Sequence, residues 1–404
     1  MTGLGEGLRA PAGKLLRAAT LVAVAAFLFR IDFLLSVAAL LVLLWAVSVW
    51  WPDRALRNVH TQRAHPRRIF HDEEATVTLT VRNDGRLPLP WLEVSDVVPF
   101  DLNLVVGGGR WVTTLLAGEQ RMFSYRVKGR RRGLYRLGPT DTHAGDVFGI
   151  RRHRGPISGA TELVVYPKIV PVGRSLLSGR APVPVLRTAI PLYEDYTRMV
   201  GVRSYRTGDS LRRVHWPATA KLGEVVVKEY LPAISRDTVV CLDLSRSSYR
   251  GARRSAGPEL AVTVAASLLR HVVVSDRLPV GLWLCAHDPL SSAPVRLLIP
   301  PRSDRAHLAS MLELLARVTV DPAADFAAGL GTATQRLPFG STLAVVTGSV
   351  TGPLAEAVAR WRGRGFAPAV FEIFPDHRLS EARRLIGLGV PVRTVESHQD
   401  LERW

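Results

Sequence analysis

The sequence predicts a membrane-anchored protein of several domains: a two-helix transmembrane hairpin, a β-sandwich and a doubly wound α/β domain. Three observations predict this fold class. Two apolar runs lie near the N-terminus, short runs of alternating apolar and polar residues follow, and from about residue 236 strand-like runs alternate with helical ones. The predicted boundaries are 1–57 for the hairpin, 58–170 for the Ig-like β-sandwich, 171–200 for a linker, 201–235 for a block rich in motifs, and 236–404 for the α/β domain.

The second apolar run, Phe33–Trp51, has the length of a membrane-spanning helix. Its 19 residues carry no charge, which is about what a hydrocarbon core of roughly 30 Å requires. The first run, Leu15–Phe29, is shorter and contains Arg17, so it spans only if Arg17 and Arg30 reach the interfaces. A cleaved signal peptide is the alternative for this run. Basic residues flank both runs, so the positive-inside rule predicts two crossings with the soluble domains in the cytoplasm.

The charge balance limits the classes of partner. The chain has 404 residues, with 53 Lys and Arg against 35 Asp and Glu, and a net charge of +18. Such a charge suits anionic lipid, nucleic acid or an acidic protein. The basic residues are spread along the chain and no nucleic-acid-binding motif is present, so we expect a lipid bilayer as a partner and no nucleic acid. The two cysteines, Cys241 and Cys285, lie in apolar runs and predict no disulfide framework.

Two kinds of periodicity separate the soluble domains. The run Ala75–Val81 reads ATVTLTV, which is typical of a half-buried strand. Further strands of the β-sandwich are predicted at 91–98, 110–116, 122–128 and 163–166. In the α/β domain, strands are predicted at 238–244, 279–286, 295–300, 342–347, 367–374 and 390–395, and helices at 258–274, 303–318, 324–336, 353–364 and 380–388. This alternation favours a mostly parallel sheet covered on both faces, with sites beyond the carboxyl ends of its strands.

A candidate metal site lies at the carboxyl end of the first α/β strand. There the run TVVCLDLSRSS, Thr238–Ser248, breaks into Asp243, Ser245 and Ser247. One carboxylate and two hydroxyls at alternating positions can supply three of the six oxygen ligands that Mg²⁺ requires. The alternative is that Asp243 and the serines cap backbone groups before the next helix.

The block that follows the linker contains a turn and a charged cluster. In TGDS, Gly208 is free to adopt positive φ. Asp209 can cap the short helical turn that carries Arg212. Arg206 and Arg212 flank Asp209 closely enough for a cluster of charged hydrogen bonds.

Aromatic residues of the same block suggest a packing role. We expect Trp216 to be a buried anchor, His215 to be structural, and Lys221–Tyr230 to form a hairpin-like pair of strands. The block then serves either as a structural plug that locks this arm onto the α/β domain, or as a docking surface for a partner.

The chain lacks the common catalytic signatures. No HExxH, GxSxG, Walker-type phosphate loop or Cys/His metal spacing is present. We therefore expect a protein that is not an enzyme. The alternatives are a metal-dependent hydrolase or phosphodiesterase that uses Asp243 and His215, and an adhesion-type module that binds a ligand outside the cell.

Three segments resemble the bacterial "domain of unknown function 58" family. They are RRGLYRLGPTDTHAGDVFGI (131–150), YPKIVPV (166–172) and RSYRTGDSLRRVHWPATAKLGEVVVKEY (203–230), and they occur in the family's order. The signature residues, structural or docking in role, are Arg203, Tyr205, Arg206, Gly208, Asp209, Arg212, His215 and Trp216.

The resemblance implies a von Willebrand factor A-like C-terminal domain and an accessory or adaptor role at the bacterial inner membrane. It also implies a MoxR-type AAA+ ATPase as partner, with a transglutaminase-like membrane protein as a further candidate.

The resemblance also bears on the metal site. In metal-binding A domains a Thr from a second loop and an Asp from a third join the DxSxS loop. Here Ala324 stands near the place of the Thr, and Gly348 stands in the place of the Asp. Loss of that carboxylate weakens the expectation of bound Mg²⁺, and it leaves the expected fold unchanged.

Overall fold

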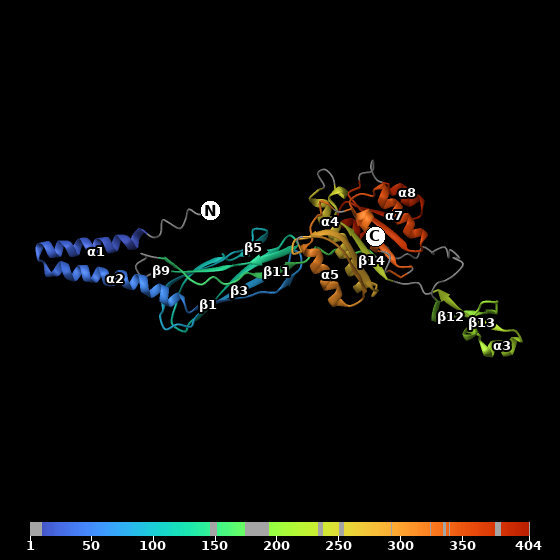
Figure 1. Ribbon diagram of the computed structural model, residues 1–404, viewed down its shortest axis with the longest axis horizontal. Helices are drawn as coiled ribbons and strands as arrows, with labels where there is room; N and C mark the ends of the chain where they lie inside the picture. Colours follow the sequence, from blue (N-terminus) through green and yellow to red (C-terminus); the bar gives the residue numbers. More distant parts are fainter. Residues whose placement is uncertain are drawn as a thin grey trace. The chain divides into compact units, whose positions relative to one another are not determined.

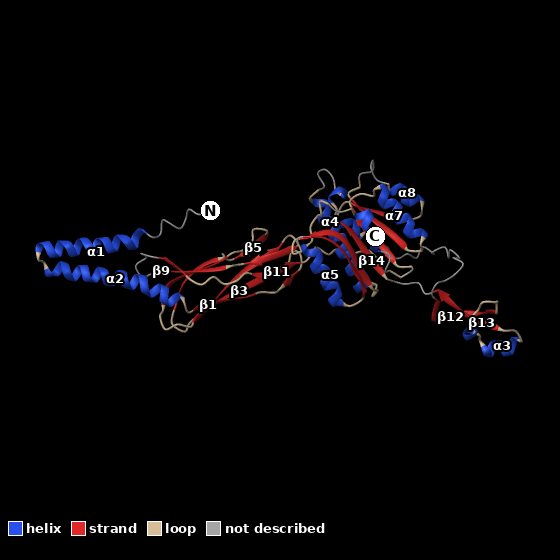
Figure 2. Cartoon of the chain, in the orientation of Figure 1, coloured by secondary structure: helices blue, strands red, loops and turns tan. Residues whose placement is uncertain are grey.

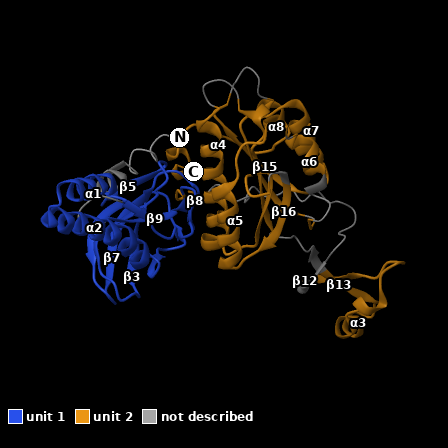
Figure 3. Cartoon of the chain, turned by 60° about the vertical axis from the view of Figure 1, so that its left-hand side comes forward, with its two compact units in different colours: residues 1–168 blue, residues 169–404 orange. Residues whose placement is uncertain are grey.

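The structure is a computed structural model, and it describes residues 10–145, 152–173, 194–232, 237–249, 254–291, 293–323, 325–333, 337–338, 340–375 and 381–403. The chain divides into two compact units, residues 1–168 and 169–404 (Figure 3). The hairpin and the β-domain share the first unit. Residues 169–173, which include the last two residues of the predicted β-sandwich and the start of the predicted linker, belong to the second unit: the Val170 amide donates to Ser267 Oγ at 2.9 Å. Most of the predicted linker, 174–193, lies outside the described residues.

Two helices form the N-terminal hairpin, α1 (Ala10–Phe29) and α2 (Asp32–Leu56), and they pack against each other (Figure 1). Between Leu16 and Trp51 the buried side chains of the hairpin are small, and its exposed side chains are mostly large and apolar. The first group is Ala19, Ala26, Ala38 and Ser48; the second includes Leu21, Phe27, Phe29, Phe33 and Leu43. Small residues allow helix backbones to approach closely in a membrane, where lipid covers the large apolar ones.

Two described helices are long and apolar enough to cross a membrane: α2, and Ala256–Ser275 in the second unit. The apolar part of α1, Leu16–Phe29, is shorter. Burial separates the two long helices, because 78% of the apolar window of Ala256–Ser275 is buried and only 11% of that of α2. The helix Ala256–Ser275 is therefore a core helix, whereas α2 exposes its apolar surface.

The β-domain contains eleven described strands. They are β1 (Val59–Ala64), β2 (Arg68–Ile69), β3 (Glu74–Asn83), β4 (Leu89–Asp96), β5 (Leu102–Val106), β6 (Arg110–Leu115), β7 (Gln120–Gly129), β8 (Gly133–Leu137), β9 (Thr140–Gly145), β10 (Arg152–Arg154) and β11 (Thr161–Val165). They form three sheets, ordered β1-β3-β7-β5, β10-β9-β4-β6 and β2-β11-β8.

The first of these sheets forms one layer, and the other two sheets together form the opposite layer. Along β3 the side chains of Val77, Leu79 and Val81 alternate inward and are fully buried. Leu79 and Val81 pack against β4, β6 and β9, whereas Val77 packs against β8 and β11. The period-two pattern of the sequence therefore forms the core of a sandwich.

An arm, residues 194–232, precedes the α/β domain. It consists of β12 (Glu194–Ser204), the 3₁₀ turn η1 (Leu211–Arg213), α3 (Trp216–Leu222) and β13 (Val226–Pro232). β13 pairs antiparallel with β12. The predicted strand pair within Lys221–Tyr230 is therefore wrong: part of that segment is helical, and the partner strand lies upstream of the turn.

The α/β domain has a six-stranded sheet with helices on both faces (Figure 2). The strand order is β16-β15-β14-β17-β18-β19, and only β16 is antiparallel to its neighbour. The strands are β14 (Thr238–Asp243), β15 (Val280–Asp288), β16 (Ala293–Arg302), β17 (Thr342–Thr347), β18 (Ala367–Ile373) and β19 (Val392–Val395). The helices are α4 (Ala256–Arg270), continued by the π-helix η4 (His271–Ser275), α5 (Arg305–Arg317), α6 (Phe326–Ala333), α7 (Gly352–Gly363), α8 (Ala382–Gly387) and α9 (Gln399–Glu402).

The two faces of β14 show how the helices are divided. Val239 and Cys241 share a core with residues of α6, α7 and α8. Val240 and Leu242 point to the opposite face and are also fully buried, and α4 contacts β14. The predicted alternation of strands and helices is confirmed, and β14 lies in the middle of the sheet, where its carboxyl end is surrounded by neighbouring strand ends.

Candidate functional site

An ion pair holds the turn of the arm. The Arg203 guanidinium donates from Nη1 to Asp209 Oδ2 at 2.7 Å and from Nη2 to Oδ1 at 2.6 Å. The Arg206 amide also donates to Asp209 Oδ2, at 2.8 Å, and Gly208 adopts a φ of +106°. The hydrogen bonds from Arg203 and then from the Arg206 amide lower the pKa of Asp209 to about 2. The turn is therefore fixed by a bidentate ion pair plus a backbone bond.

The partner of Asp209 differs from the predicted one. The sequence suggested that Asp209 caps the turn carrying Arg212, with the side chains of Arg206 and Arg212 around it. Instead Asp209 reaches back to Arg203 on β12, and the cap residue of η1, Ser210, makes no side-chain capping bond. The carboxylate therefore ties the turn to the strand before it.

The arm exposes large apolar side chains. Trp216 is 67% exposed, so the prediction of a buried anchor is wrong. The reason is local: α3 has only seven residues and buries none of them, and Trp216 is its first residue. Further exposed apolar residues of the arm include Val202, Tyr205, Leu211, Leu222 and Val225. This group, with Trp216, is called the arm patch below.

A groove of about 580 Å³ lies beside the arm patch. Its lining combines apolar and charged side chains: Val202, Arg203, Ser204, Arg206, Leu222, Glu224 and Val226. His215 lies outside this lining and has a structural role, because its Nδ1 accepts the Ala218 amide at 3.1 Å and caps α3. A histidine occupied in this way is poorly placed for catalysis.

The second candidate site lies at the carboxyl end of β14. Asp243 is 1% exposed, and its two oxygens accept four hydrogen bonds. Oδ1 accepts from the Ser245 amide at 2.9 Å and from Ser245 Oγ at 2.5 Å. Oδ2 accepts from Ser248 Oγ at 2.5 Å and from Thr347 Oγ1 at 2.7 Å. The carboxylate thus joins the end of β14 to the next loop and to the end of β17.

Of the three predicted ligands, the structure brings together Asp243 and Ser245. Ser247 Oγ donates to Ser245 Oγ at 3.5 Å. Ser248 occupies the position expected for Ser247. Ala324 lies outside the described residues.

The geometry around Asp243 does not fit an octahedral Mg²⁺ site. A carboxylate oxygen has two lone pairs, and both oxygens of Asp243 already accept two hydrogen bonds each. A Cβ at position 348 would lie 2.4 Å from the Ser248 carbonyl oxygen and 2.7 Å from the Tyr249 ring, so this loop has no room for a carboxylate. Among the described residues, no group of three His, Cys, Asp or Glu side chains is placed to hold a metal. Of the four bonds to Asp243, only that from the Ser245 amide involves a backbone group, and Ser245 makes no side-chain capping bond to the 3₁₀ turn Arg246–Ser248, so the capping alternative holds only in part.

A second carboxylate, Asp321, lies beside this loop. Its backbone bonds Leu244 and Arg246, and its Oδ1 accepts the Ala323 amide at 2.9 Å. Its buried Oδ2 has no hydrogen-bond partner among the described residues. Burial raises the pKa of Asp243, against the hydrogen bonds that lower it. Burial, with Asp243 nearby, raises the pKa of Cys285 to about 11, so its thiol is a poor nucleophile.

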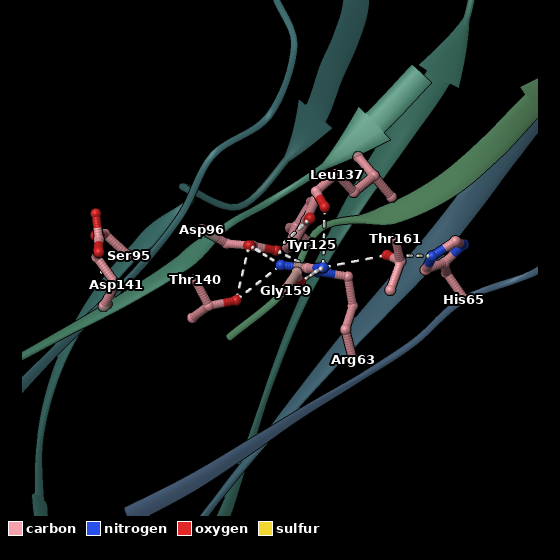
Figure 4. Close-up of polar contacts among 10 residues, drawn as sticks. All are labelled: Arg63, His65, Ser95, Asp96, Tyr125, Leu137, Thr140, Asp141, Gly159 and Thr161. Atoms are coloured by element: carbon pink, nitrogen blue, oxygen red, sulfur yellow. Dashed lines mark hydrogen bonds and ion pairs between the residues drawn. The ribbon is translucent and has the colours of Figure 1, made fainter. Parts of the chain in front are cut away.

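A third cluster lies inside the β-domain (Figure 4). Arg63 pairs with Asp96, with side chains 2% and 0% exposed. Asp96 also accepts from Tyr125 Oη at 2.7 Å and from Thr140 Oγ1 at 2.9 Å. Arg63 donates further to the Leu137 carbonyl at 2.9 Å. Arg63 and Asp96 neutralise each other, and each makes further hydrogen bonds. The cluster therefore holds the two layers together, and its polar groups are already occupied by one another.

The sequence reasoning missed Ser248, Thr347, Asp321 and the Arg63 cluster. One of these residues, Thr347, could have been predicted from the sequence. Thr347 ends a strand that pairs in parallel with β14, with Leu242 opposite Val346, so the next residues, Asp243 and Thr347, had to be neighbours. The others depend on loop conformation or on contacts up to 98 residues apart.

Comparison with known proteins gives a family match. The family described as "Protein of unknown function DUF58" matches residues 201–369, which include most of the arm and the sheet from β14 to β17. The "Uncharacterized protein YeaD" of Bacillus subtilis (strain 168) is 22% identical over 232 residues, which make up 56% of this chain and 56% of that one. The chain thus matches about half the length of this curated relative. Both matches support the DUF58 family.

Solved structures show only faint likeness. The CARDB domain of PF1109 from Pyrococcus furiosus is 13% identical, covers 27% of this chain and 94% of that one, and has a TM-score of 0.21. Native alpha-2-macroglobulin from Escherichia coli, from domain MG7 to the C-terminus, is 15% identical, covers 29% of this chain and 20% of that one, and has a TM-score of 0.25. TM-scores this low carry no argument.

Proposed function

We propose that this chain is a membrane-tethered adaptor without enzymatic activity, and that it docks a MoxR-type AAA+ ATPase through the arm patch. The observation that carries the proposal is the exposure of Trp216 within the motif block shared with the DUF58 family. Exposed aromatic residues on a surface fixed by an ion pair are typical of binding hot spots, because a preorganised surface loses little entropy on binding.

The hydrogen bonds of Asp243 and His215 support an adaptor over an enzyme. Asp243 and His215, the residues of the alternative metal-dependent hydrolase, both make structural hydrogen bonds. The α/β domain then serves as a scaffold. Its strand order and the Asp243 loop at the end of a central strand support the von Willebrand A-like assignment, and the occupied lone pairs of Asp243 argue against metal-dependent adhesion.

The hairpin supports the tether. Between Leu16 and Trp51 its buried residues are small and its exposed residues are mostly large and apolar, which is the arrangement that lipid favours and water opposes. We expect the soluble domains in the cytoplasm of a bacterium, because basic residues flank both apolar runs. A transglutaminase-like membrane protein is a further candidate partner within the same membrane.

Co-purification from native membranes tests the proposal. The tagged full chain is extracted in mild detergent, with and without nucleotide, and bound proteins are identified by mass spectrometry. We expect a MoxR-type ATPase to be retained, and Trp216→Ala with Leu222→Ala to reduce its retention by about tenfold or more, the effect of a binding hot spot. Ile386→Ala, at a residue 57% exposed in the α/β domain, is the matched control and should leave retention unchanged. Equal retention by all variants, or no AAA+ ATPase at all, would contradict the proposal.

A reporter fused after Trp404 tests the location. A reporter that works only in the cytoplasm should be active there. Activity of an export-dependent reporter instead would place the arm outside the cell, and would favour the adhesion-type module.

A further inference from the structure

The end of α2 lies inside the β-domain. Trp51 Nε1 donates to the Pro88 carbonyl at 2.8 Å. One turn later, Ala55 and Leu56 are 1% and 2% exposed, in a core that they share with β3, β4, β6 and β9. The hairpin therefore enters the sandwich as a packed helix, without a flexible linker between them (Figure 1).

Three loops surround this end of α2. Asn83, which is fully buried, joins two of them, because its Nδ2 donates to the Leu87 carbonyl at 2.9 Å and to the Leu116 carbonyl at 3.1 Å. The third loop passes Leu56, since a Cβ on Gly155 would lie 3.0 Å from Leu56 Cδ2. The loops 84–88, 116–119 and 155–157 are called the proximal rim below.

The proximal rim carries exposed apolar side chains, the basic Arg86 and two acidic residues, Asp84 and Glu119, which pair with Arg82 and Arg121. Leu116 is 57% and Ile157 is 52% exposed, and Arg86 is exposed on the loop that Trp51 contacts. Around the end of α2 and loop 84–88, the basic residues outnumber the acidic ones. The basic residues are Arg54, Arg57, Arg82 and Arg86; the acidic residues are Asp53 and Asp84, which pair with Arg57 and Arg82.

The depth of the proximal rim follows from the helix length. The uncharged run ends at Trp51, and Trp is typical of the membrane interface. From there to Leu56 the helix rises about 8 Å, at 1.5 Å per residue. The headgroup layer of a bilayer is about 5–8 Å thick on each side. If α2 spans the membrane, the rim lies at the depth of the phosphates.

We propose that the proximal rim is a contact surface for anionic phospholipid headgroups, in the same bilayer that the hairpin spans. Leu116 and Ile157 enter the interface, and Arg54 and Arg86 bind phosphates. The inference rests on the proposed membrane tether, and it adds that the β-domain contacts the membrane surface directly. Together with the packed end of α2, this contact fixes the tilt of the β-domain.

Site-specific quenching tests the contact. The full chain is reconstituted into vesicles of phosphatidylcholine and phosphatidylglycerol that contain a lipid with a nitroxide on its headgroup. Bimane is attached at Leu116→Cys, at Ile157→Cys or at Phe100→Cys. The native Cys241 and Cys285 are buried, and burial raises the pKa of each thiol, so both should react slowly.

Phe100 is the matched control. It is a fully exposed apolar residue that lies past the other end of β4, whose eight residues span about 26 Å. We expect quenching at Leu116→Cys and Ile157→Cys to exceed that at Phe100→Cys by about threefold, because of this separation. Arg86→Glu with Arg54→Glu should lower quenching at Leu116→Cys by roughly twofold in the anionic vesicles and leave it unchanged in pure phosphatidylcholine.

The outcomes separate the two proposals. Extraction of the chain from the vesicles by alkali would overturn the tether, and the contact with it. Resistance to alkali with equal quenching at Leu116→Cys and Phe100→Cys would overturn the contact alone. Strong quenching at Leu116→Cys that is insensitive to Arg86→Glu with Arg54→Glu would overturn the role of anionic headgroups.

Discussion

The chain pairs an arginine with an aspartate in two places whose surroundings differ. Arg63 and Asp96, inside the β-domain, have side chains that are 2% and 0% exposed. Arg203 and Asp209, in the arm, have side chains that are 36% and 15% exposed. The first pair binds further buried groups, whereas the second fixes a turn beside exposed apolar side chains. The same chemistry therefore holds a core in one place and shapes a surface in the other.

This difference indicates which of the two pairs lies beside a candidate binding surface. In the β-domain the polar groups around the pair are paired with one another, so the cluster is complete without a partner. In the arm the ion pair satisfies its own charges and leaves Trp216 and Leu222 uncovered, on a two-stranded sheet that is too small to have much core of its own. An exposed apolar surface of this kind supports the docking role that we propose for the arm.

The largest expected effect comes from breaking the buried pair. Arg63→Met leaves the Asp96 carboxylate buried without its cation, and this should lower the free energy of unfolding of the β-domain by about 3–5 kcal/mol. Hydrogen exchange of peptides from β3 and β4 in the full chain measures it. Arg63→Met combined with Asp96→Leu is the control, since removing both charges should restore most of the protection. A loss below about 1 kcal/mol in the single variant would show that the pair behaves like a surface one.

Asp243 extends the comparison to a buried carboxylate that has hydroxyl partners and, among the described residues, no paired cation. Asp243→Ala removes the acceptor of Ser245, Ser248 and Thr347, and should lower the free energy of unfolding of the α/β domain by about 3 kcal/mol. Asp243→Asn keeps the shape and one acceptor, and should cost about 1 kcal/mol. Hydrogen exchange of β14 and β17 measures both. Added Mg²⁺ should leave the protection of the native chain unchanged, and a rise that Asp243→Ala abolishes would show a working metal site.

These sites also show which features of the structure can be predicted from the sequence. Strand β17, Thr342–Thr347, was predicted with its observed bounds, because an uninterrupted apolar run bounded by Gly is a strong strand signal. Thr347 at its end follows from parallel pairing alone. Trp216 did not follow, since the usual burial of Trp assumes a core, and a seven-residue helix on a two-stranded sheet provides little. The Arg63 cluster was equally hidden, because its members come from β1, β4, β7, β8 and β9, and only the packed sandwich brings them together.

Breaking the Arg203–Asp209 pair should affect binding and leave folding almost unchanged. Arg203→Ala frees the turn, so the arm patch must be ordered when a partner binds. We expect retention of the AAA+ ATPase to fall by about three- to tenfold, less than for Trp216→Ala with Leu222→Ala, because ordering costs about 0.5–1.5 kcal/mol per side chain. Hydrogen exchange of β14 and β17 should match the native chain. A loss of that protection would mean that the arm stabilises the α/β domain, as the structural-plug hypothesis predicts.

The smallest expected effect is a change in the mobility of the arm turn at low pH. Arg203 and the Arg206 amide lower the pKa of Asp209 from 3.8 to about 2, so the contribution of the pair is complete above pH 3.8 and is lost as the pH falls through about 2. A spin label at Leu211→Cys should therefore keep the same mobility from pH 7 to pH 4 and become more mobile below. With Asp209→Asn it should be mobile throughout, and a label at Ile386→Cys separates local loosening from acid unfolding of the α/β domain. Mobility at Leu211→Cys that rises between pH 6 and pH 4.5, while the label at Ile386→Cys is unchanged, would mean that a group other than Asp209 holds the turn. In that case the Arg203–Asp209 pair would not be what preorganises the arm patch for binding.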